Sequence, residues 1–365
     1  MAPELPDSQK WLKFALKEFE KEIWHQFYED GVNFEGSTSY HRLVLEMTAY
    51  TVLLCHNYKI KFSNNSYKRL EKAFEYTTYY LKPNGLAPQF GDNDSGRFLI
   101  LSNYFNWRSL DHRYLLSIAK RIFPKNKLFQ LKPKNYLKYF KNGQILIMKK
   151  WDWYLAINAQ PIGQDGNGGH NHNDTGSFEL NYKGKDFIID PGTYVYTANP
   201  QKRNEFRSIS HHSVFAIQNQ EFSQFVTGNL FILKKSSKPQ VTLLTKNQEI
   251  IFKIRYYNYQ LCRIFKIRPK SIKIIDIANG LKEKNQYLIE NLILDETIET
   301  KINKNQCLIV SSGNHSLSIK MAKPKIKKLA VSKSYGHKVR SKKITNQLKL
   351  DSRKYEIIIQ KQPNN

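Results

Sequence analysis

The spacing of the apolar residues changes near position 135, and this change constrains the fold more than any other feature of the sequence. Before it, Gln9 to Phe27 carries large apolar side chains every three or four residues, which is the period of an amphipathic helix. Residues 38–57 repeat this spacing, 66–81 continue it up to a Pro-Asn-Gly turn signal, and 108–119 show it again. The sequence therefore predicts a helical first part, residues 1–134.

Short runs rich in β-branched and aromatic residues follow, separated by polar turns. Among them are residues 145–148, 153–157, 178–182, 187–189 and 355–359. Such runs are typical of strands. We therefore predict an all-β second part, residues 135–365, most simply a large antiparallel sandwich. The 365 residues are enough for two such domains, so the expected fold class is α+β and multidomain.

Lysine and arginine outnumber aspartate and glutamate by 58 to 31, which gives a net charge of +27. A field of this sign attracts polyanions, such as nucleic acid, an anionic membrane surface or an acidic polysaccharide. The basic residues are spread along the chain and no recognised nucleic-acid motif occurs, so we expect no nucleic-acid partner. An AT-rich genome that favours lysine codons is the alternative origin of the charge.

The three cysteines, Cys55, Cys262 and Cys307, form no CxxC pair, which argues against a thiolate zinc site. Their odd number leaves at least one thiol outside any disulfide and does not fix the redox compartment. The start of the chain lacks a basic segment followed by an apolar one, so no signal peptide is visible. No run of about 18 apolar residues occurs, and we expect no stable membrane insertion.

Four of the ten histidines gather in one stretch of the second part, beside a glycine-rich loop. His170 and His172 stand at i and i+2, which would point both to one face of a strand. Asp190 follows at the end of an apolar run, and His211 and His212 come further on. Neutral imidazoles with one carboxylate are the ligands that zinc prefers outside cysteine sites. The alternative is a set of hydrogen-bonded core or loop histidines.

Three segments closely resemble the start of the β domain in heparinase II/III-like polysaccharide lyases. They are Gly168-Gly-His-Asn-His-Asn-Asp-Thr-Gly-Ser-Phe-Glu-Leu, then Asp190-Pro-Gly-Thr-Tyr-Val-Tyr, then Phe206-Arg-Ser-Ile-Ser-His-His-Ser-Val. The family pattern is His-x-His-x-Asp, Asp-x-Gly-x-Tyr and Arg-Ser-Thr-x-x-His-Asn-Thr, in the same order. In such proteins the first histidine is catalytic, while the second histidine, the strand-end aspartate and the last histidine hold zinc.

The resemblance implies that His170 is catalytic and that His172, Asp190 and His212 bind a zinc ion. That zinc would be structural and would hold the loop of the catalytic histidine in register. His212 is preferred to His211 because the downstream segment then aligns without a gap. An isoleucine and a serine replace the usual threonine and asparagine nearby, so the third ligand stays open between these two histidines.

The helical part also resembles this family. Asp30 to His41 is similar to the toroid segment whose tyrosine acts in catalysis, which implies that Tyr40 is the proton-transferring phenol and that the helices are part of an (α/α) toroid. The alternative is that Tyr40 merely packs. An ordinary tyrosine has a pKa of about 10, so a tyrosine base needs a nearby positive charge. Arg207 or His41 could supply it.

Further residues are candidates for contact with a sugar. The polar loop from Gly91 to Arg97 recurs in bacterial relatives, and Ser334-Tyr-Gly is a weaker echo of it. The substrate-binding candidates are His41, Arg97, Asn171 and Tyr194.

The reaction implied is β-elimination on an acidic polysaccharide that contains uronic acid. A non-catalytic protein that binds acidic glycans in bacterial surface-polysaccharide metabolism is the alternative, and a zinc-dependent hydrolase is a third hypothesis. Full-length relatives carry further toroid helices with an Asn-His motif that has no convincing equivalent here, so the chain resembles the C-terminal part of a longer protein. The resemblance implies a periplasmic or cell-envelope location, with the cytoplasm left open, and no oligomeric state is predicted.

Overall fold

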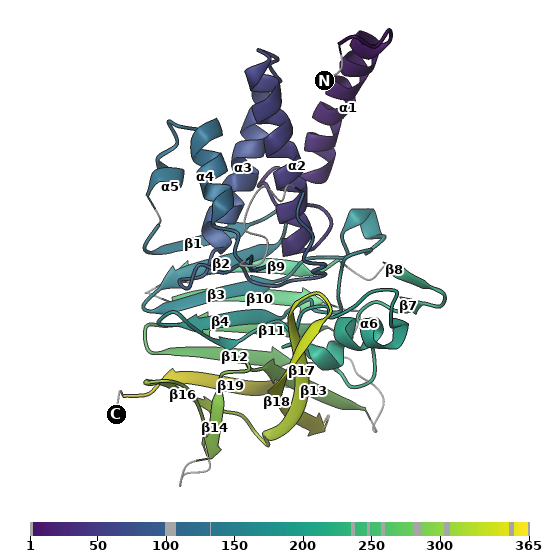
Figure 1. Ribbon diagram of the computed structural model, residues 1–365. Coiled ribbons are helices and arrows are strands. Elements are labelled where there is room, and N and C mark those ends of the chain that lie inside the picture. Colours follow the sequence, from purple (N-terminus) through teal and green to yellow (C-terminus); the bar gives the residue numbers. More distant parts are fainter. Residues whose placement is uncertain are drawn as a thin grey trace.

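The computed structural model describes residues 3–98, 107–131, 133–234, 238–246, 249–256, 260–279, 286–302, 307–349 and 354–363 (Figure 1). The helices of the first part are α1 (Ser8–Gln26), α2 (Thr38–Asn57), α3 (Asn64–Tyr80), α4 (Tyr114–Ile122) and the short α5 (Lys127–Gln130). The first three confirm the helices predicted from the apolar spacing. The fourth begins at Tyr114 rather than at Arg108, because residues 109–113 form turns and irregular backbone. Among the described helices, none is both long enough and apolar enough to cross a membrane.

Helix α2 is fixed at its start by a cap and along its length by an apolar core. The hydroxyl of Ser37 accepts a hydrogen bond of 3.1 Å from the backbone N–H of Tyr40, which satisfies a donor that the first helical turn leaves open. Leu45 of α2 shares one buried cluster with Leu70 and Phe74 of α3. This packing sets the direction in which the first turn of α2 presents its side chains.

Two antiparallel sheets share one hydrophobic core in the second part, to which Leu155 and Leu180 contribute from one sheet and Phe252 and Phe265 from the other. The first sheet contains, in spatial order, β1 (Tyr136–Phe140), β2 (Ile145–Lys150), β3 (Trp153–Asn158), β4 (Phe178–Tyr182) and β5 (Lys185–Ile188). The second contains, in spatial order, β14 (Glu299–Ile302), β15 (Leu308–Ser312), β16 (His315–Lys320), β19 (Lys354–Lys361), β12 (Ser271–Ile277), β11 (Leu261–Ile267), β10 (Glu249–Tyr256) and β9 (Gln240–Lys246).

Smaller elements flank these sheets. A third sheet contains β17 (Lys325–Ser334), β18 (His337–Lys349), β13 (Tyr287–Ile293) and β6 (Phe215–Ile217) in spatial order. Its long hairpin β17–β18 crosses in front of the others in Figure 1. On one side lie α6 (Pro200–Arg207), the 3-10 turn η3 (Ile209–His211) and the hairpin of β7 (Phe225–Val226) and β8 (Asn229–Leu233).

The helices stand on the outer face of the first sheet (Figure 1). Val32 and Tyr80 from the helical part share a buried cluster with Ile147 and Tyr154 of β2 and β3. Beside this cluster, the buried Lys82, which follows α3, forms ion pairs with Glu179 of β4 and Asp186 of β5. The junction brings the start of α2 next to the glycine-rich loop that precedes β4, and this is where the candidate site lies.

Candidate active site

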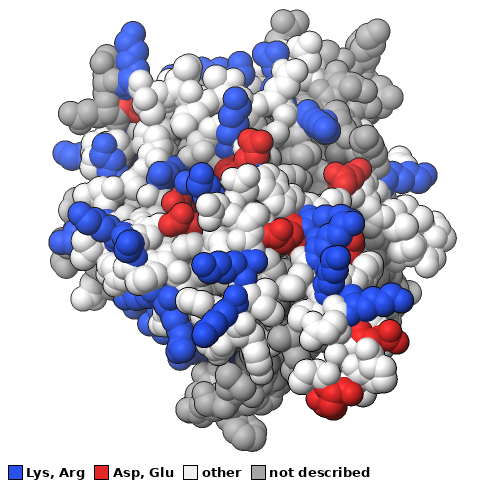
Figure 2. Space-filling model, turned by 90° about the horizontal axis from the view of Figure 1, so that it is seen from above, with Lys and Arg blue, Asp and Glu red and all other residues white. Residues whose placement is uncertain are grey.

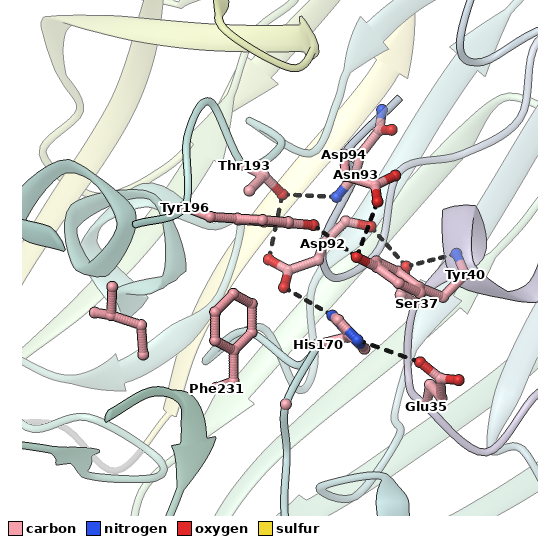
Figure 3. Close-up of polar contacts among 12 residues, drawn as sticks. Glu35, Ser37, Tyr40, Asp92, Asn93, Asp94, His170, Thr193, Tyr196 and Phe231 are labelled. Carbon is pink, nitrogen blue, oxygen red and sulfur yellow. Dashed lines mark hydrogen bonds and ion pairs between the residues drawn. The ribbon is translucent and has the colours of Figure 1, made fainter. Parts of the chain in front are cut away.

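Tyr40, in the first turn of α2, and His170, in the loop before β4, lie with their rings stacked (Figure 3). The ring centroids are 3.5 Å apart and the ring planes meet at 18°. The Tyr40 hydroxyl donates a hydrogen bond of 3.1 Å to Oδ2 of Asp94, and it lies 3.3 Å from the hydroxyl of Tyr196. Tyr40 and His170, which two different sequence motifs proposed for proton transfer, are thus in contact.

Both ring nitrogens of His170 face carboxylates. Nδ1 lies 3.1 Å from Oδ2 of Asp92, and Nε2 lies 3.3 Å from Oε2 of Glu35. Burial raises the pKa of Glu35, although the nearby His170 acts in the opposite direction. Glu35 therefore holds a proton more readily than an exposed glutamate does.

Asp92 is buried and receives hydrogen bonds from several side chains. The guanidinium of Arg203, on α6, donates to both of its carboxylate oxygens at 2.7 and 2.8 Å. Nε2 of His172 lies 3.0 Å from Oδ1 of Asp92. Burial alone would raise the pKa of Asp92, but the charge of Arg203 and the hydrogen bonds from His170 and His172 outweigh it and hold the pKa well below its usual range. Asp92 is thus an ionised acceptor.

An ionised Asp92 fixes the tautomers of both histidines, because a carboxylate can only accept hydrogen bonds. His170 then carries its proton on Nδ1 and keeps a lone pair on Nε2. His172 carries its proton on Nε2 and keeps a lone pair on Nδ1. The first lone pair faces the partly exposed side of the site near Glu35, and the second faces the buried side.

A glycine makes the close approach of these loops possible. Gly91 has φ +66°, and a Cβ atom there would lie 2.6 Å from the carbonyl oxygen of Gly36 and 2.7 Å from that of His170. The next residue, Asp92, donates its backbone N–H to the same His170 carbonyl at 2.9 Å. A side chain at position 91 would push these segments apart.

His172, Asp190 and His212 form a buried cluster whose potential ligand atoms all lie within 4.8 Å of one another. Nδ1 of His212 lies 2.8 Å from Oδ2 of Asp190. Nδ1 of His172 and Nε2 of His212 are buried and have no hydrogen-bond partner among the described residues. Because such orphaned atoms are costly in a protein interior, they fit a site that binds a metal ion.

The electrostatics of the cluster favour neutral imidazoles. Burial lowers the pKa of His212 to about 4 and also lowers that of His172. Neutral histidine is the form that ligates a metal. Burial raises the pKa of Asp190 well above its usual range, and a bound cation would act in the opposite direction. Oδ2 of Asp174 is a further buried atom without a partner in the described chain, and burial raises the pKa of Asp174 to about 7.

The neighbouring His211 points away from the cluster. Its Nε2 lies 3.4 Å from Oε1 of Glu205, and its ring packs on Phe206. Of the two histidines left open by the sequence, the structure places His212 beside His172 and Asp190.

The two groups considered as sources of positive charge for Tyr40 have other partners. His41 lies in the helical core with Nε2 3.1 Å from Oγ1 of Thr77, and burial lowers its pKa to about 3, so it is neutral at neutral pH. The buried Arg207 donates to the carbonyl of Leu230 and lies over the ring of Phe225.

The surroundings of Tyr40 are therefore acidic rather than basic. Burial raises its pKa, and the nearby carboxylates of Asp94 and Asp92 act in the same direction, while the hydrogen bond with Tyr196 opposes them. The phenol is protonated at neutral pH and suits a proton donor better than a base.

Three other predicted residues lie around the site rather than beside the stacked rings. The guanidinium of Arg97 lies over the ring of Tyr114. The buried side chain of Asn171 accepts a hydrogen bond of 2.7 Å from the backbone of Gly163. Tyr194 packs on the ring of Phe206, with the ammonium of Lys338 over its own ring.

The loop from Gly91 to Arg97 supplies Asp92 and Asp94 to the site, and the turn around Tyr335 supports it. The hydroxyl of Tyr335 accepts from the backbone of Tyr196 at 3.0 Å, and its own backbone donates to Ser95 at 2.9 Å. Roles for Asp92, Glu35, Tyr196 and Arg203 were not predicted. For Asp92 the signal was its place in a motif already singled out, whereas nothing local marked Arg203.

Two family models match the chain. The model described as "Heparinase II/III-like, C-terminal" matches residues 132–359, and the one described as "Heparinase II/III N-terminus" matches residues 1–113. Together they cover the first three helices and the sheets.

Individual relatives agree with these matches. A heparin-sulfate lyase of Pedobacter heparinus is 25% identical over 276 residues, which cover 68% of this chain and 40% of the relative. A heparin-sulfate lyase of Bacteroides thetaiotaomicron is 22% identical over 352 residues, covering 88% of this chain and 48% of the relative. The crystal structure of heparan sulfate lyase HepC from Pedobacter heparinus superimposes with a TM-score of 0.77 at 21% identity, covering 100% of this chain and 58% of that one.

The chain spans about half the length of the relatives it matches. The superposition shows the fold, and the family models show the descent. On these matches, the chain belongs to the heparinase II/III-like family.

Proposed function

We propose that this chain is the catalytic part of a polysaccharide lyase that cleaves a uronate-containing polysaccharide by β-elimination. The observation that carries the proposal is the stacked pair of Tyr40 and His170, which lies between carboxylates at the junction of the two parts. The relatives named heparin-sulfate lyases supply the substrate class. On the face seen in Figure 2, basic side chains are spread among fewer acidic ones, which suits an acidic polymer.

In the proposed reaction, Nε2 of His170 takes the proton from C5 of the uronate. The electrons of the broken C5–H bond form a C4–C5 double bond as the bond from C4 to the glycosidic oxygen breaks. The protonated phenol of Tyr40 gives its proton to the departing oxygen. The products are an unsaturated uronate and a new hydroxyl end. The imidazole of His170 ends protonated and the phenol of Tyr40 ends ionised, and proton exchange with solvent returns both to their starting states.

The charge of the substrate must be tolerated where it approaches His170. A second, ionised carboxylate there would repel the uronate, and burial favours the neutral form of Glu35. Asp92 holds the imidazole ring of His170 by a hydrogen bond to Nδ1, and Arg203 donates to Asp92, so that the two form a balanced pair of charges behind the ring. We propose that these residues position His170 and do not themselves transfer protons.

We propose zinc for the cluster of His172, Asp190 and His212, because two neutral imidazoles and a carboxylate are a zinc donor set. A bound zinc ion would supply structural rigidity to the loop that carries His170. Asp92 connects the two centres, since it orients both His170 and His172. A carboxylate behind a ligating histidine is the usual way in which proteins orient such ligands.

For the architecture, we propose that the helices are the C-terminal part of an (α/α) toroid and that the sheets form an antiparallel sandwich. Two large apolar side chains of α1 support the toroid proposal, because Trp11 and Phe14 are 56% and 66% exposed and further helices would cover them. A periplasmic or cell-envelope location is proposed on the same family grounds, since that is where acidic polysaccharides would be met.

The first test is Tyr40→Phe, assayed for unsaturated product on heparan sulfate and other uronate polymers. Loss of the phenolic proton should lower kcat by about 10²–10⁴-fold, with zinc content and thermal stability unchanged. Exposed Tyr58→Phe, at the end of α2, is the matched control and should keep full activity. Full turnover in Tyr40→Phe would remove Tyr40 from the mechanism, and glycan binding without product by the wild-type chain would favour a non-catalytic binder.

A further inference from the structure

A pocket of about 300 Å³ lies on the third sheet, away from the stacked Tyr40 and His170. Its floor is the face of β13, β18 and β17 that is turned from the core, and its wall is formed by η3 and the segment after β6. The lining residues that carry the argument are Glu221, Asn291, Lys325, Lys327, Lys343 and Thr345.

The register of the strands places complementary polar groups side by side on this floor. Asn291 is paired with Thr345, and Thr345 with Lys325, so an amide, a hydroxyl and an ammonium lie in one row across three strands. In the next row on the same face, Lys343 is paired with Lys327. Hydrogen-bonding and cationic groups are thus arranged as two adjacent rows.

One of these polar groups is deeply buried and incompletely satisfied. Asn291 is 1% exposed, and its Nδ2 lies 3.4 Å from the carbonyl of Ile209. Its Oδ1 has no hydrogen-bond partner in the part of the chain that the structure describes. A buried acceptor of this kind calls for a donor, and a hydroxyl group of a ligand is one.

The charge of the pocket is positive. Lys343 donates a hydrogen bond of 2.7 Å to the carbonyl of Ser210, and burial together with the nearby Lys327 lowers its pKa. Glu221 is the only acid among the lining residues that the structure describes, and it accepts hydrogen bonds from Ser208 at 2.5 Å and from the backbone of Ile209 at 3.0 Å. The lining thus includes three lysines and one glutamate, whose carboxylate is already hydrogen-bonded within the wall.

We propose that this pocket binds an acidic sugar unit, one that carries hydroxyl groups together with a carboxylate or sulfate. The lysine ammonium groups would bind the anionic group, while Asn291 and Thr345 would form hydrogen bonds with the hydroxyl groups. A cavity of this size holds roughly one or two sugar rings. A plain inorganic anion would leave the buried amide oxygen of Asn291 without a donor.

The turn η3 lies between this pocket and the metal cluster. The pocket would therefore hold a part of the polysaccharide that is distant from the reacting bond. The carbonyl of Ile209 faces Asn291 in the pocket, and the backbone N–H of His212 donates to that same carbonyl at 3.3 Å. The choice of a heparan-type glycan as ligand rests on the proposed function, but binding of a glycan in this pocket does not require that the chain cleave it. Two linked subsites on one polymer raise its effective affinity.

The test is Lys325→Gln combined with Lys327→Gln in the full chain, titrated calorimetrically with a defined heparan sulfate oligosaccharide. Both lysines are exposed at the pocket rim, so folding should be preserved. We expect the dissociation constant to rise about tenfold. The control is Lys301→Gln combined with Lys328→Gln, which removes equal charge from exposed positions outside the pocket and should change the constant by less than about twofold.

A second variant, Thr345→Val, tests the role of the hydroxyl-binding groups without a change of charge. It should weaken the oligosaccharide severalfold and leave the weak binding of inorganic sulfate unchanged. Equal losses in the pocket and control pairs would overturn the proposal in favour of the overall charge. Unchanged binding with a shift in oligomeric state of the pocket pair, seen by light scattering, would overturn it in favour of an interface between copies.

Failure of the proposed function would look different from failure of this pocket. A chain that yields no unsaturated product but loses oligosaccharide affinity in the pocket variants would disprove the lyase and support the pocket. A chain that turns over normally while all pocket variants bind as the wild type does would disprove the pocket alone.

Discussion

The carboxylate of Asp92 determines which nitrogen of each neighbouring histidine is available for chemistry. It accepts from Nδ1 of His170 and from Nε2 of His172, and Arg203 keeps it ionised. The same residue thereby leaves one lone pair that the proposed mechanism uses for proton transfer and one that the proposed metal ion would use. An asparagine at this position could donate as well as accept, and it would no longer select these tautomers.

Asp92→Asn should therefore be both less stable and less active. Removal of one partner of a buried ion pair leaves Arg203 without its counter-charge and should lower the free energy of unfolding by about 3–5 kcal/mol. The measurement is urea unfolding, with exposed Asp152→Asn as a control that should stay within about 0.5 kcal/mol. An equal loss in both variants would show that the pair of Asp92 and Arg203 adds nothing specific.

The choice between His212 and His211 as a metal ligand can be tested directly. His212→Ala removes a nitrogen of the buried cluster, whereas His211→Ala removes a ring that faces Glu205. We expect about one zinc ion per chain in the wild type and in His211→Ala, and a substoichiometric content in His212→Ala, as measured by elemental mass spectrometry. Retention of zinc in His212→Ala would disprove the assigned ligand.

The site residues that the sequence could propose are those marked by a local motif, and the structure brings Tyr40 next to His170 and His172 next to Asp190. Tyr40, His170, His172 and Asp190 each stand in a short motif that can be read without knowledge of their distant partners. Arg203 does not, because its role comes only from a carboxylate far away in the sequence.

The predicted Arg207 shows the same limit. It lies one helical turn after Arg203 on α6, and the sequence offered no way to decide which of the two guanidinium groups reaches Asp92. Only the docking of α6 against the loop of Asp92 makes that choice, and it turns Arg207 toward Leu230 instead.

At the scale of elements, helix α2 assigns different environments to consecutive residues. Neighbouring side chains on a helix point about 100° apart. Tyr40 therefore faces the site, while His41 faces α3 and packs against the rings of Tyr76 and Tyr80. The same helix thus carries a functional side and a core side, and a sequence pattern alone does not separate them.

The burial of His41 predicts a pH dependence of stability. Its pKa is about 3 in the folded chain and about 6.5 when unfolded. The unfolded chain therefore binds the proton first as the pH falls. Stability from this residue is fully present above pH 6.5 and falls by about 1.4 kcal/mol per pH unit below it, down to about pH 3.

His41→Gln should flatten this dependence between pH 7 and pH 5, measured as the free energy of urea unfolding at several pH values. His56→Gln, at the exposed end of the same helix, is the control and should keep the wild-type slope. Identical slopes in all three proteins would show that His41 is protonated as easily in the folded chain as in the unfolded one.

At the scale of the whole molecule, a buried lysine holds the helical part against the first sheet. Nζ of Lys82, which follows α3, lies 3.0 Å from Glu179 of β4 and 3.1 Å from Asp186 of β5, and all three side chains are at least nine-tenths buried. Burial alone would lower the pKa of Lys82, but the two carboxylates outweigh it and raise the pKa. The group is therefore charged, and its partners depend on it.

Lys82→Met should loosen the junction between the two parts. Two buried carboxylates would lose their cation, and we expect a loss of about 3–5 kcal/mol in urea unfolding and faster proteolysis between the parts. Lys72→Met, on the exposed side of α3, is the matched control and should change stability by less than about 0.5 kcal/mol. A loss no larger than that of the control would mean that hydrophobic contacts alone hold the junction.

The spacing of apolar residues determined how much of the fold could be predicted from the sequence. The first three helices and many strands were predicted within a few residues, because apolar spacing reflects which side of an element is buried, whereas the start of α4 was misplaced and α5 and α6 were not predicted. The order of strands could not be predicted in this way. The last strand, β19, pairs with β12 and β16 in the middle of the second sheet, and no local pattern announces such distant neighbours.

The junction also has a consequence for how such a chain can be inherited. Glu35, Tyr40 and Asp92 come from the helical part, whereas His170 and Arg203 come from the part that follows. On the proposed mechanism, neither portion contains a whole proton-transfer pair, so a gene that divided them would have to keep its two products in lasting contact. A gene break between these two portions would therefore abolish the proposed activity unless the two products stay associated.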